Sequence, residues 1–360
     1  MISSKVIADS LSPQGDRLIS ILCTFPRFIL AEVNTHRMLG KNTSSSRAIP
    51  FKKMLQAVQD NPFVPIAWQK DHPGMQGTEY LDTRGSEIAE SAWLVARNKA
   101  IEQAWYLNTK DVTKQLANRL LEPFMWTTMV ITGSLEGGWD NFFDLRCPQY
   151  KLHEGDDHKT YKSWKDAVID YPAAENAFIL DRLKLNKGLA EIHMMALAEA
   201  IYDSVQESTS KQLKAGDWHI PFIDQIDIST LSRELEPKIN ESITTGVDAH
   251  NYLTNVAVKV STAMCARTSY TIVGEEKAVN YGDLIALDDR LLGQWPPHSS
   301  PMEHCARVMD FYEYNTSIKG SMQEVFIGRD KSYDISKEVK GWCRNYRGFI
   351  QRRHLIETKV

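Results

Sequence analysis

The segment from Thr35 to Arg47, THRMLGKNTSSSR, concentrates side chains that can bind an anion or polarise a carbonyl group. Arg37 and Arg47 carry planar guanidinium groups, whose forked N–H donors suit phosphate or the edge of a carbonyl compound. The run Ser44–Ser46 adds hydroxyl groups, and its backbone N–H groups can turn towards an anion. A solvated polar loop would have the same composition, so both interpretations stay open on these residues alone.

The order of the residues in this segment resembles the signature of the flavin-dependent thymidylate synthases. That signature reads Arg-His-Arg, seven residues and then Ser, with an asparagine five residues after the second arginine and a final arginine. Here His36 and Arg37 are followed by seven residues and then Ser45, and Asn42 and Arg47 stand at the other two places. The resemblance favours ligand binding over a plain loop.

Three further blocks resemble the family in the family's own order. LANRLLEP, residues 116–123, is similar to a helix whose arginine contacts the nucleotide, which implies this role for Arg119. WDNFFDLR, residues 139–146, is similar to an element in which an asparagine, Asn141, faces the flavin and an arginine, Arg146, faces the pyrimidine. LAEIHMMALAEAI then resembles the helix that follows in the family.

The remaining blocks stand near the C-terminus, although the family has them ahead of its Arg-His-Arg segment. They are CARTSY, residues 265–270, and HSSPMEH, residues 298–304. Circular permutation is the simplest account, because the termini of a domain often lie close together at its surface. We therefore expect the HSSPMEH segment to lie beside the THRMLGKNTSSSR segment in space.

The resemblance implies two groups of site residues. The group implied to bind the nucleotide is Glu32, Thr43, Ser44, Ser45, Ser46, Arg47, Arg119 and Arg146, with Arg146 as the catalytic residue. The group implied to line the flavin or the folate is Thr35, His36, Arg37, Asn42, Asn141, Ser269, His298, Ser300 and Glu303.

The implied reaction adds a one-carbon unit to C5 of dUMP and reduces it to a methyl group, which gives dTMP. Methylenetetrahydrofolate would supply the carbon, FAD would carry the hydride, and NADPH would be the reductant. No cysteine occupies a nucleophile position in a matching block, which suits a route in which the reduced flavin does the chemistry. The family shares its active sites between the protomers of a tetramer, so we expect a homotetramer.

Four positions depart from the family pattern and keep other functions open. Thr35 and Gly137 stand where the family has arginines, and Glu32 and Thr43 stand where it has a glutamine and a glutamate. One alternative is a related pyrimidine modification such as hydroxymethylation, in which the added carbon is hydrated. The other is a nucleotide-binding relative that has lost catalysis.

The composition places these residues in an ordinary globular chain. Of the 360 residues, 42% are hydrophobic and 24% charged, and the net charge of −4 argues against coating of nucleic acid. No apolar run approaches the length of a membrane helix, and the N-terminal residues lack the apolar core of a signal peptide. The five cysteines form no Cys-x-x-Cys pair, which indicates reduced thiols and a cytoplasmic protein.

We expect a single elaborated catalytic domain over residues 1–360 with an α+β fold, in which helices flank an antiparallel sheet. A strand is predicted from Arg17 to Leu30, with a break at Pro26 or a place at the edge of its sheet, and a short helix is predicted after Pro50. Residues 61–80 are predicted to form a loop. Further helices are predicted over residues 87–121, 189–206, 249–265 and 283–292.

Three polar or basic segments have simpler interpretations than binding sites. Residues 151–186 are predicted to form a surface insertion, because they are rich in lysine, aspartate and histidine. The histidines of HEGDDH, residues 153–158, are spaced by five rather than four, so no metal site is predicted there. The tail from Trp342 to His354 is predicted to be a packed terminal helix with solvated arginines rather than a nucleic-acid-binding segment.

Overall fold

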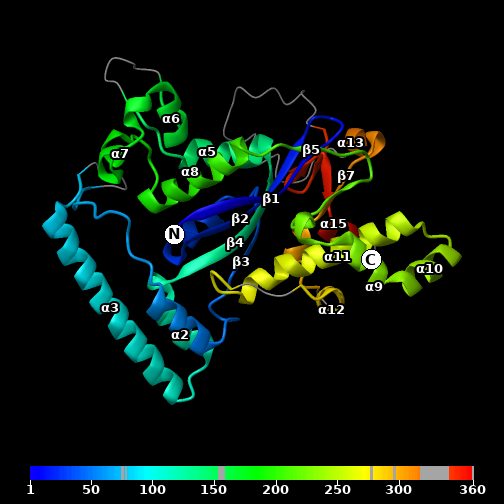
Figure 1. Ribbon diagram of the computed structural model, residues 1–360, viewed down its shortest axis with the longest axis horizontal. Coiled ribbons are helices and arrows are strands. Elements are labelled where there is room, and N and C mark those ends of the chain that lie inside the picture. Colours follow the sequence, from blue (N-terminus) through cyan, green and yellow to red (C-terminus); the bar gives the residue numbers. More distant parts are fainter. Residues whose placement is uncertain are drawn as a thin grey trace.

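A five-stranded sheet forms the centre of the protein in the computed structural model (Figure 1). The structure describes residues 1–73, 77, 79–152, 159–275, 279–294, 297–316 and 340–358. The strand order is β3-β4-β2-β1-β5. The strands are β1 (Ser3–Leu11), β2 (Arg17–Pro26), β3 (Gly40–Thr43), β4 (Trp126–Ser134) and β5 (Lys211–Gln212).

The sheet is mixed, which corrects the expectation of an antiparallel sheet. Strands β1 to β4 pair antiparallel, but β5 pairs with β1 in the parallel direction at Ser10 and Leu11. A parallel neighbour needs a long crossover connection. Here that connection is the whole chain between β1 and β5, and it includes α8. The expected α+β class is confirmed.

Strand β2 shows why this sheet is buried on both faces. Its residues Ile19, Ile21, Cys23 and Phe25 alternate with Leu18, Ser20, Leu22 and Thr24, so the two sets face opposite sides. The first set is fully buried against α8 (Ile192–Gln206) and α5 (Asp140–Arg146). The strand ends at Pro26, short of the predicted Leu30, and the chain continues through a 3₁₀ turn, Arg27–Ile29, into the short helix α1 (Leu30–Asn34).

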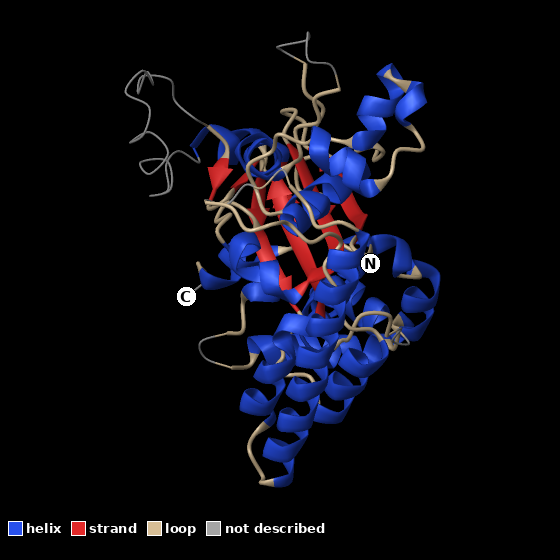
Figure 2. Ribbon diagram, turned by 90° about the vertical axis from the view of Figure 1, so that its left-hand side faces the viewer, coloured by secondary structure: helices blue, strands red, loops and turns tan. Residues whose placement is uncertain are grey.

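The opposite face is covered by α11 (Ala249–Arg267) and by the C-terminal part of the chain. Cys265 and Met264 of α11 pack against Ile7, Leu22 and Val130 of the sheet. Helix α12 (Tyr281–Leu292), with α9 (Ile228–Glu234) and α10 (Glu236–Thr244), packs on the far side of α11. Figure 2 shows helices around the sheet and beyond one of its ends.

A third helical group follows β3 in sequence. It consists of α2 (Phe51–Asp60), α3 (Thr83–Thr109), α4 (Lys114–Ala117) and a 3₁₀ segment over Asn118–Phe124. The helix predicted after Pro50 is confirmed, and the helical pattern predicted over residues 87–121 is divided among the last three of these elements. The described residues between 61 and 80 form a loop, in which Gln69 and Tyr80 make an isolated β-bridge.

The C-terminal tail corrects the prediction of a terminal helix from Trp342 to His354. Gly341, Arg344 and Gly348 have positive φ angles, which no helix interior tolerates. A hairpin and a further strand therefore precede a helix that begins only at Arg352. These elements are β8 (Trp342–Cys343), β9 (Tyr346–Arg347), β10 (Phe349–Gln351) and α15 (Arg352–Glu357), and β10 joins β7 (Ala306–Val308) and β6 (Trp218–His219) in a small sheet, with α13 (Phe311–Thr316) after β7.

Residues 151–186 include α6 (Trp164–Asp170) and α7 (Ile179–Leu185), which lie outside α8 in Figure 1. Glu199 of α8 accepts hydrogen bonds from the backbone N–H of Trp164 and from the Tyr150 hydroxyl. Burial raises the pKa of Glu199 to about 6. The segment thus has its own apolar cluster, and hydrogen bonds to Glu199 attach it to α8. HEGDDH lies outside the described residues.

Among the helices that the structure describes, none has the length and the apolar composition to cross a membrane.

A buried ion pair joins the C-terminal helix to the helical layer. The Arg352 guanidinium donates to both carboxylate oxygens of Asp288 on α12, at 2.5 and 2.7 Å, and to the Thr262 hydroxyl on α11 at 2.6 Å. Asp288 is fully buried and Arg352 nearly so. Removal of one partner from such a pair leaves a buried charge without compensation, which is far more costly than loss of an exposed pair.

We predict that Asp288→Asn lowers the free energy of unfolding by about 3–5 kcal/mol. The matched control is Asp289→Asn on the same helix, because Asp289 is exposed and pairs with Lys259 at 2.8 Å. The control should cost less than about 1 kcal/mol. Urea unfolding of both variants decides the matter, and equal losses would show that the buried pair contributes no more than the exposed one.

Candidate functional site

Three segments that are far apart in the sequence meet at the short strand β3. The Ser45 N–H donates to the Ser269 carbonyl oxygen at 2.8 Å, and the Asn42 amide donates to the Cys265 carbonyl oxygen at 2.5 Å. The Ser300 hydroxyl donates to the Lys41 carbonyl oxygen at 3.4 Å. The CARTSY and HSSPMEH segments therefore both lie beside β3, and the expected adjacency is confirmed.

Close packing at the start of β3 requires a glycine. A Cβ atom on Gly40 would lie 2.7 Å from the Tyr346 hydroxyl and 3.2 Å from a Glu303 carboxylate oxygen. The Glu303 carboxylate in turn pairs with Arg353 of α15. The C-terminal tail thus holds the HSSPMEH segment against the strand, which no pattern in the local sequence indicated.

The implied catalytic arginine lies next to the residues of the Arg-His-Arg-like segment. Arg146, at the end of α5, donates from Nε to Nε2 of His36 at 3.0 Å and from Nη2 to the Thr35 hydroxyl at 3.3 Å. The His36 ring packs edge-on against Phe142 of the same helix. Asp144, the neighbouring carboxylate that could have paired with Arg146, pairs with Lys162 instead.

His36 accepts a hydrogen bond from Arg146 because its ring is neutral. Burial, followed by the positive charges of Arg146 and Lys41, lowers the pKa of His36 to about 4. A neutral imidazole has one acceptor nitrogen, and here the guanidinium uses it. The pair fixes the direction of Arg146 without neutralising its charge.

Lys41 is a functional candidate that the sequence reasoning missed. Its ammonium group donates to the carbonyl oxygens of Val33, at 3.4 Å, and of His36. Burial lowers its pKa to about 8, against the opposing effect of Glu303. The lysine fixes the turn that carries Thr35 and His36. Its position in a half-buried strand was the available signal, but β3 itself was not predicted in this polar stretch.

Glu32 faces the same cluster. One of its carboxylate oxygens is buried and has no hydrogen-bond partner within the described part of the chain. Burial and the nearby Glu191 raise the pKa of Glu32, while Arg146 and His193 oppose this shift. Such an unpaired acceptor marks a place where a ligand or an ordered water can donate.

Glu191 and His193 lie near Glu32 and hold two segments of the chain together. The sequence analysis assigned them only to a helix. The Glu191 carboxylate caps α8 by accepting from the N–H groups of His193 and Met194. His193 bonds Glu191 through Nδ1 at 2.5 Å, and its Nε2 accepts from the Ile66 N–H at 3.0 Å. The pair thereby ties the loop after α2 to α8.

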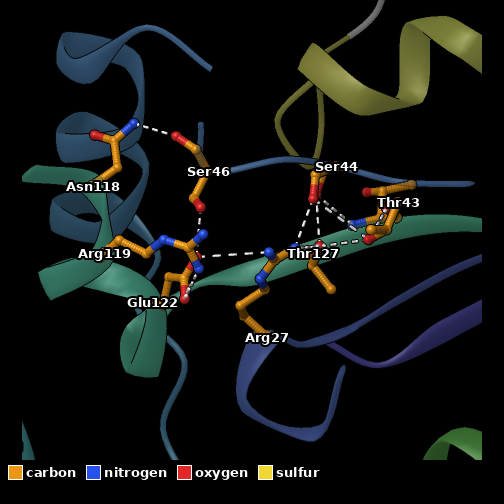
Figure 3. A network of polar contacts seen from close by, with 9 residues as sticks. Arg27, Thr43, Ser44, Ser46, Asn118, Arg119, Glu122 and Thr127 are labelled. Carbon is orange, nitrogen blue, oxygen red and sulfur yellow. Dashed lines mark hydrogen bonds and ion pairs between the residues drawn. The ribbon is translucent and has the colours of Figure 1, made fainter. Parts of the chain in front are cut away.

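A second polar cluster lies at the other end of β3 (Figure 3). Glu122 is at its centre: its carboxylate accepts from the Ser46 hydroxyl at 2.5 Å and from Arg119 at 3.4 Å, and Arg27 lies 3.6 Å away. The sequence-predicted Ser46 and Arg119 are thus brought together through a carboxylate. Sequence reasoning singled out neither Glu122 nor Arg27, because each stands alone in an apolar segment.

The turn after β3 offers free donors beside this cluster. The Ser45 carbonyl oxygen accepts from the N–H groups of Ala48 and Ile49, and the Asn118 amide holds the Ser46 carbonyl oxygen at 2.6 Å. The N–H groups of Ser46 and Arg47 make no hydrogen bond within the described residues. Free N–H groups at the start of a helical turn, with arginines nearby, can bind an anion.

Other predicted residues are placed more loosely. Arg37, Arg47 and His298 are exposed. Asn141 is exposed too, and its amide donates to the Gly137 carbonyl oxygen at 3.0 Å. No described contact joins the Arg146 cluster to the Arg119 cluster, and β3 between them is roughly 10 Å long. Within the described residues, no group of three metal-binding side chains comes together.

A chain of buried hydrogen bonds runs under the HSSPMEH segment and across the sheet. His219 bonds the hydroxyls of Ser10 and Ser20, both at 2.8 Å, and Ser20 bonds Thr132 at 2.5 Å. Thr132 then bonds Nδ1 of His304 at 2.9 Å, the last residue of HSSPMEH. Nε2 of His304 is buried with no partner among the described residues. These hydrogen bonds fix the position of the HSSPMEH segment relative to the central sheet.

A scan against models of protein families finds no match, and no curated protein matches the sequence. Distant structural similarity exists to nucleotide methylases. Two structures of the UMP/dUMP methylase PolB from Streptomyces cacaoi, bound with 5-Br dUMP and 5-Br UMP, match at 12% identity with TM-scores of 0.34 and 0.36. The matches cover 51% and 55% of this chain, and 64% and 86% of those chains.

Thymidylate synthase X (ThyX) from Helicobacter pylori, in a structure with FAD and dUMP, matches at 14% identity with a TM-score of 0.27. That match covers 52% of this chain and 67% of the ThyX chain. For the first PolB structure, the aligned region is less than two thirds of that protein's length.

The two buried histidines predict how stability depends on pH. Burial lowers the pKa of both His219 and His304 from 6.5 to about 3. The unfolded chain binds a proton on each below about pH 6.5, whereas the folded chain does not until about pH 3, so acid favours unfolding. As the pH falls through this range, each histidine should therefore lower the free energy of unfolding by about 1.4 kcal/mol for every pH unit.

His304→Gln should make this pH dependence shallower by about 1.4 kcal/mol per pH unit, as measured by urea unfolding between about pH 6 and about pH 4. His250→Gln, at an exposed histidine, controls for the loss of a histidine as such. A slope equal to that of the parent protein would contradict a buried, neutral His304.

Proposed function

We propose that the protein is a flavin-dependent methylase of a pyrimidine nucleotide, which adds a one-carbon unit to C5 of dUMP and reduces it to give dTMP. The meeting of the 35–47, 265–270 and 298–304 segments at β3 carries this proposal. These are the blocks that resemble the flavin-dependent thymidylate synthases, and a chance resemblance gives no reason for the last two to lie against the first. Circular permutation of that family's fold is part of the proposal.

We propose that a flavin binds beside β3, with the residues that the family resemblance implies. Arg37 is exposed without a described partner and suits a pyrophosphate, while Thr35, Asn42, Asn141, Ser269, His298, Ser300 and Glu303 offer further polar groups. FAD would supply hydride transfer there, with NADPH as the reductant and methylenetetrahydrofolate as the carbon source.

The cysteines support a route without a thiolate nucleophile. Cys23, Cys147, Cys265 and Cys305 are buried, and burial raises the pKa of each thiol. Cys343 is half-buried and its pKa is also raised. Because only the thiolate attacks carbon efficiently, none of these groups suits nucleophilic attack on the pyrimidine.

Arg146 is assigned the task of activating the pyrimidine. A fixed cation against the N3–C2 edge stabilises negative charge there and makes C5 more nucleophilic. Neutral His36 and the Thr35 hydroxyl hold the guanidinium in place, and Glu32 offers an acceptor beside it. A neutral imidazole is suited to this positioning, because an imidazolium would repel the arginine.

The nucleotide's phosphate is assigned to the other end of β3. The N–H groups of Ser46 and Arg47 belong to the turn after the strand, and Arg119 lies near Ser46 through Glu122, with Thr43 and Ser44 nearby (Figure 3). We assign Ser45 and the exposed Arg47 side chain to the same phosphate. Because the two clusters share no described contact within one chain, we propose that sites are completed between copies in a homotetramer.

Two other functions use the same geometry. Hydroxymethylation would bind the same nucleotide and folate but hydrate the added carbon. A non-catalytic relative would bind the nucleotide without turnover, and the departures at Thr35, Thr43 and Gly137 are the observation in its favour.

We predict that the purified protein is yellow or binds added FAD, and that with dUMP, methylenetetrahydrofolate and NADPH it gives a product with the mass of dTMP. Mass spectrometry of the product separates the three functions. A hydroxymethyl product would identify the first alternative, and FAD or dUMP binding without turnover would identify the second. Failure to bind either FAD or dUMP would refute the proposal.

We predict that Arg146→Lys lowers turnover about a hundredfold or more and changes FAD affinity little, because lysine keeps the charge but lacks the planar fork. Arg233→Lys, at an exposed arginine of α9, is the matched control and should keep parental turnover. Turnover of the Arg146 variant within about threefold of the parent would reject the catalytic assignment.

A further inference from the structure

Glu122 occupies the position that an anion would take in the second cluster. Its carboxylate lies among three donors on different segments: the Ser46 hydroxyl, the Arg119 guanidinium and the Arg27 guanidinium. Two arginines and one carboxylate leave the cluster with an excess positive charge. The exposed Arg47 directly follows Ser46 in the sequence and adds a further positive charge. Only part of that positive charge is therefore neutralised from within the protein.

Arg27 is a fixed, buried member of this cluster. One of its terminal nitrogens donates to the Ser44 carbonyl oxygen at 2.6 Å and lies 3.4 Å from the Thr127 hydroxyl. Its side chain is only 11% exposed, whereas its distance to Glu122 is 3.6 Å, beyond a good hydrogen bond. A buried guanidinium with a distant counterion retains a strong attraction for a second anion.

Arg119 is the exposed member of this cluster. Its side chain is 50% exposed, and its contacts with the two Glu122 oxygens, both at 3.4 Å, are long. These are its only described partners. Exposed, long ion pairs of this kind are weak, so a phosphate group can displace the carboxylate from Arg119.

We propose that Glu122 acts as an internal competitor that holds Ser46 and Arg119 in the empty site and is displaced by the phosphate of a phosphate monoester. The carboxylate prevents the two arginines from remaining unpaired when the ligand leaves. It also lowers the affinity of the site, because the incoming phosphate must first break the contacts with Glu122. This inference rests on the proposed function insofar as the monoester is a pyrimidine nucleotide.

The test compares Glu122→Gln with the parent, using inorganic phosphate and then dUMP as ligands in calorimetric titrations. We expect the variant to bind both about tenfold more tightly, since a charged competitor has been removed. Without ligand its melting temperature should fall, because Arg27 loses its counterion, and added phosphate should restore it. The double variant Arg119→Ala, Glu122→Gln should lose most of the gain in affinity.

Glu275→Gln is the matched control, since the Glu275 side chain is 21% exposed against 22% for Glu122 and it pairs with Lys53 rather than with an arginine of this cluster. It should leave both affinities unchanged. If Glu122→Gln does not fold, Glu122→Asp decides, because withdrawal of the carboxylate by one methylene group should still tighten binding. Unchanged or weaker phosphate binding in the folded variant would overturn the inference.

The outcomes separate this inference from the proposed function. Tighter phosphate binding with no dUMP binding by any variant would support the competitor and contradict a nucleotide methylase. Conversion of dUMP by the parent, with no gain in affinity on loss of the Glu122 charge, would contradict the competitor alone.

Discussion

The hydrogen bonding of β3 is the constraint on which the candidate site depends. The strand is only four residues long, and one of its edges pairs with β4. Its other side would be an open edge, and backbone polar groups buried there must find partners. The Ser300 hydroxyl supplies one for the Lys41 carbonyl oxygen, and the Ser269 carbonyl oxygen accepts from the Ser45 N–H just after the strand. The Asn42 side chain adds a hydrogen bond to the Cys265 carbonyl oxygen. A single short strand thus brings together the two ends of the sequence.

The arginines near the two ends of this strand have different kinds of partner. At one end a neutral histidine orients Arg146, so the guanidinium keeps its full charge for a ligand. At the other end a carboxylate partly neutralises Arg27 and Arg119. Burial underlies both arrangements, because it makes protonation of His36 unfavourable and makes an unpaired Arg27 costly.

Buried polar groups elsewhere fix the layers that carry the site. The His219–Ser20–Thr132–His304 chain joins the central sheet to the HSSPMEH segment, and the Arg352–Asp288 pair joins the last helix to α12. Each group has few alternative partners in an apolar layer, so each contact specifies one register. The C-terminal tail therefore takes part in positioning the site, although the sequence predicted only a packed terminal helix with solvated arginines.

The sequence by itself determined the α+β class, a strand that begins at Arg17, the main helices, and the segments that meet at β3, since these depend on local periodicity and on short motifs. It could not determine β3, the parallel strand β5 or the tail hairpin, whose stability comes from partners remote in sequence. The roles of Lys41, Glu122 and Arg27 were likewise decided only by tertiary structure. A lone charged residue has no local signature, and what it does depends on which charges the fold places within a few ångströms of it.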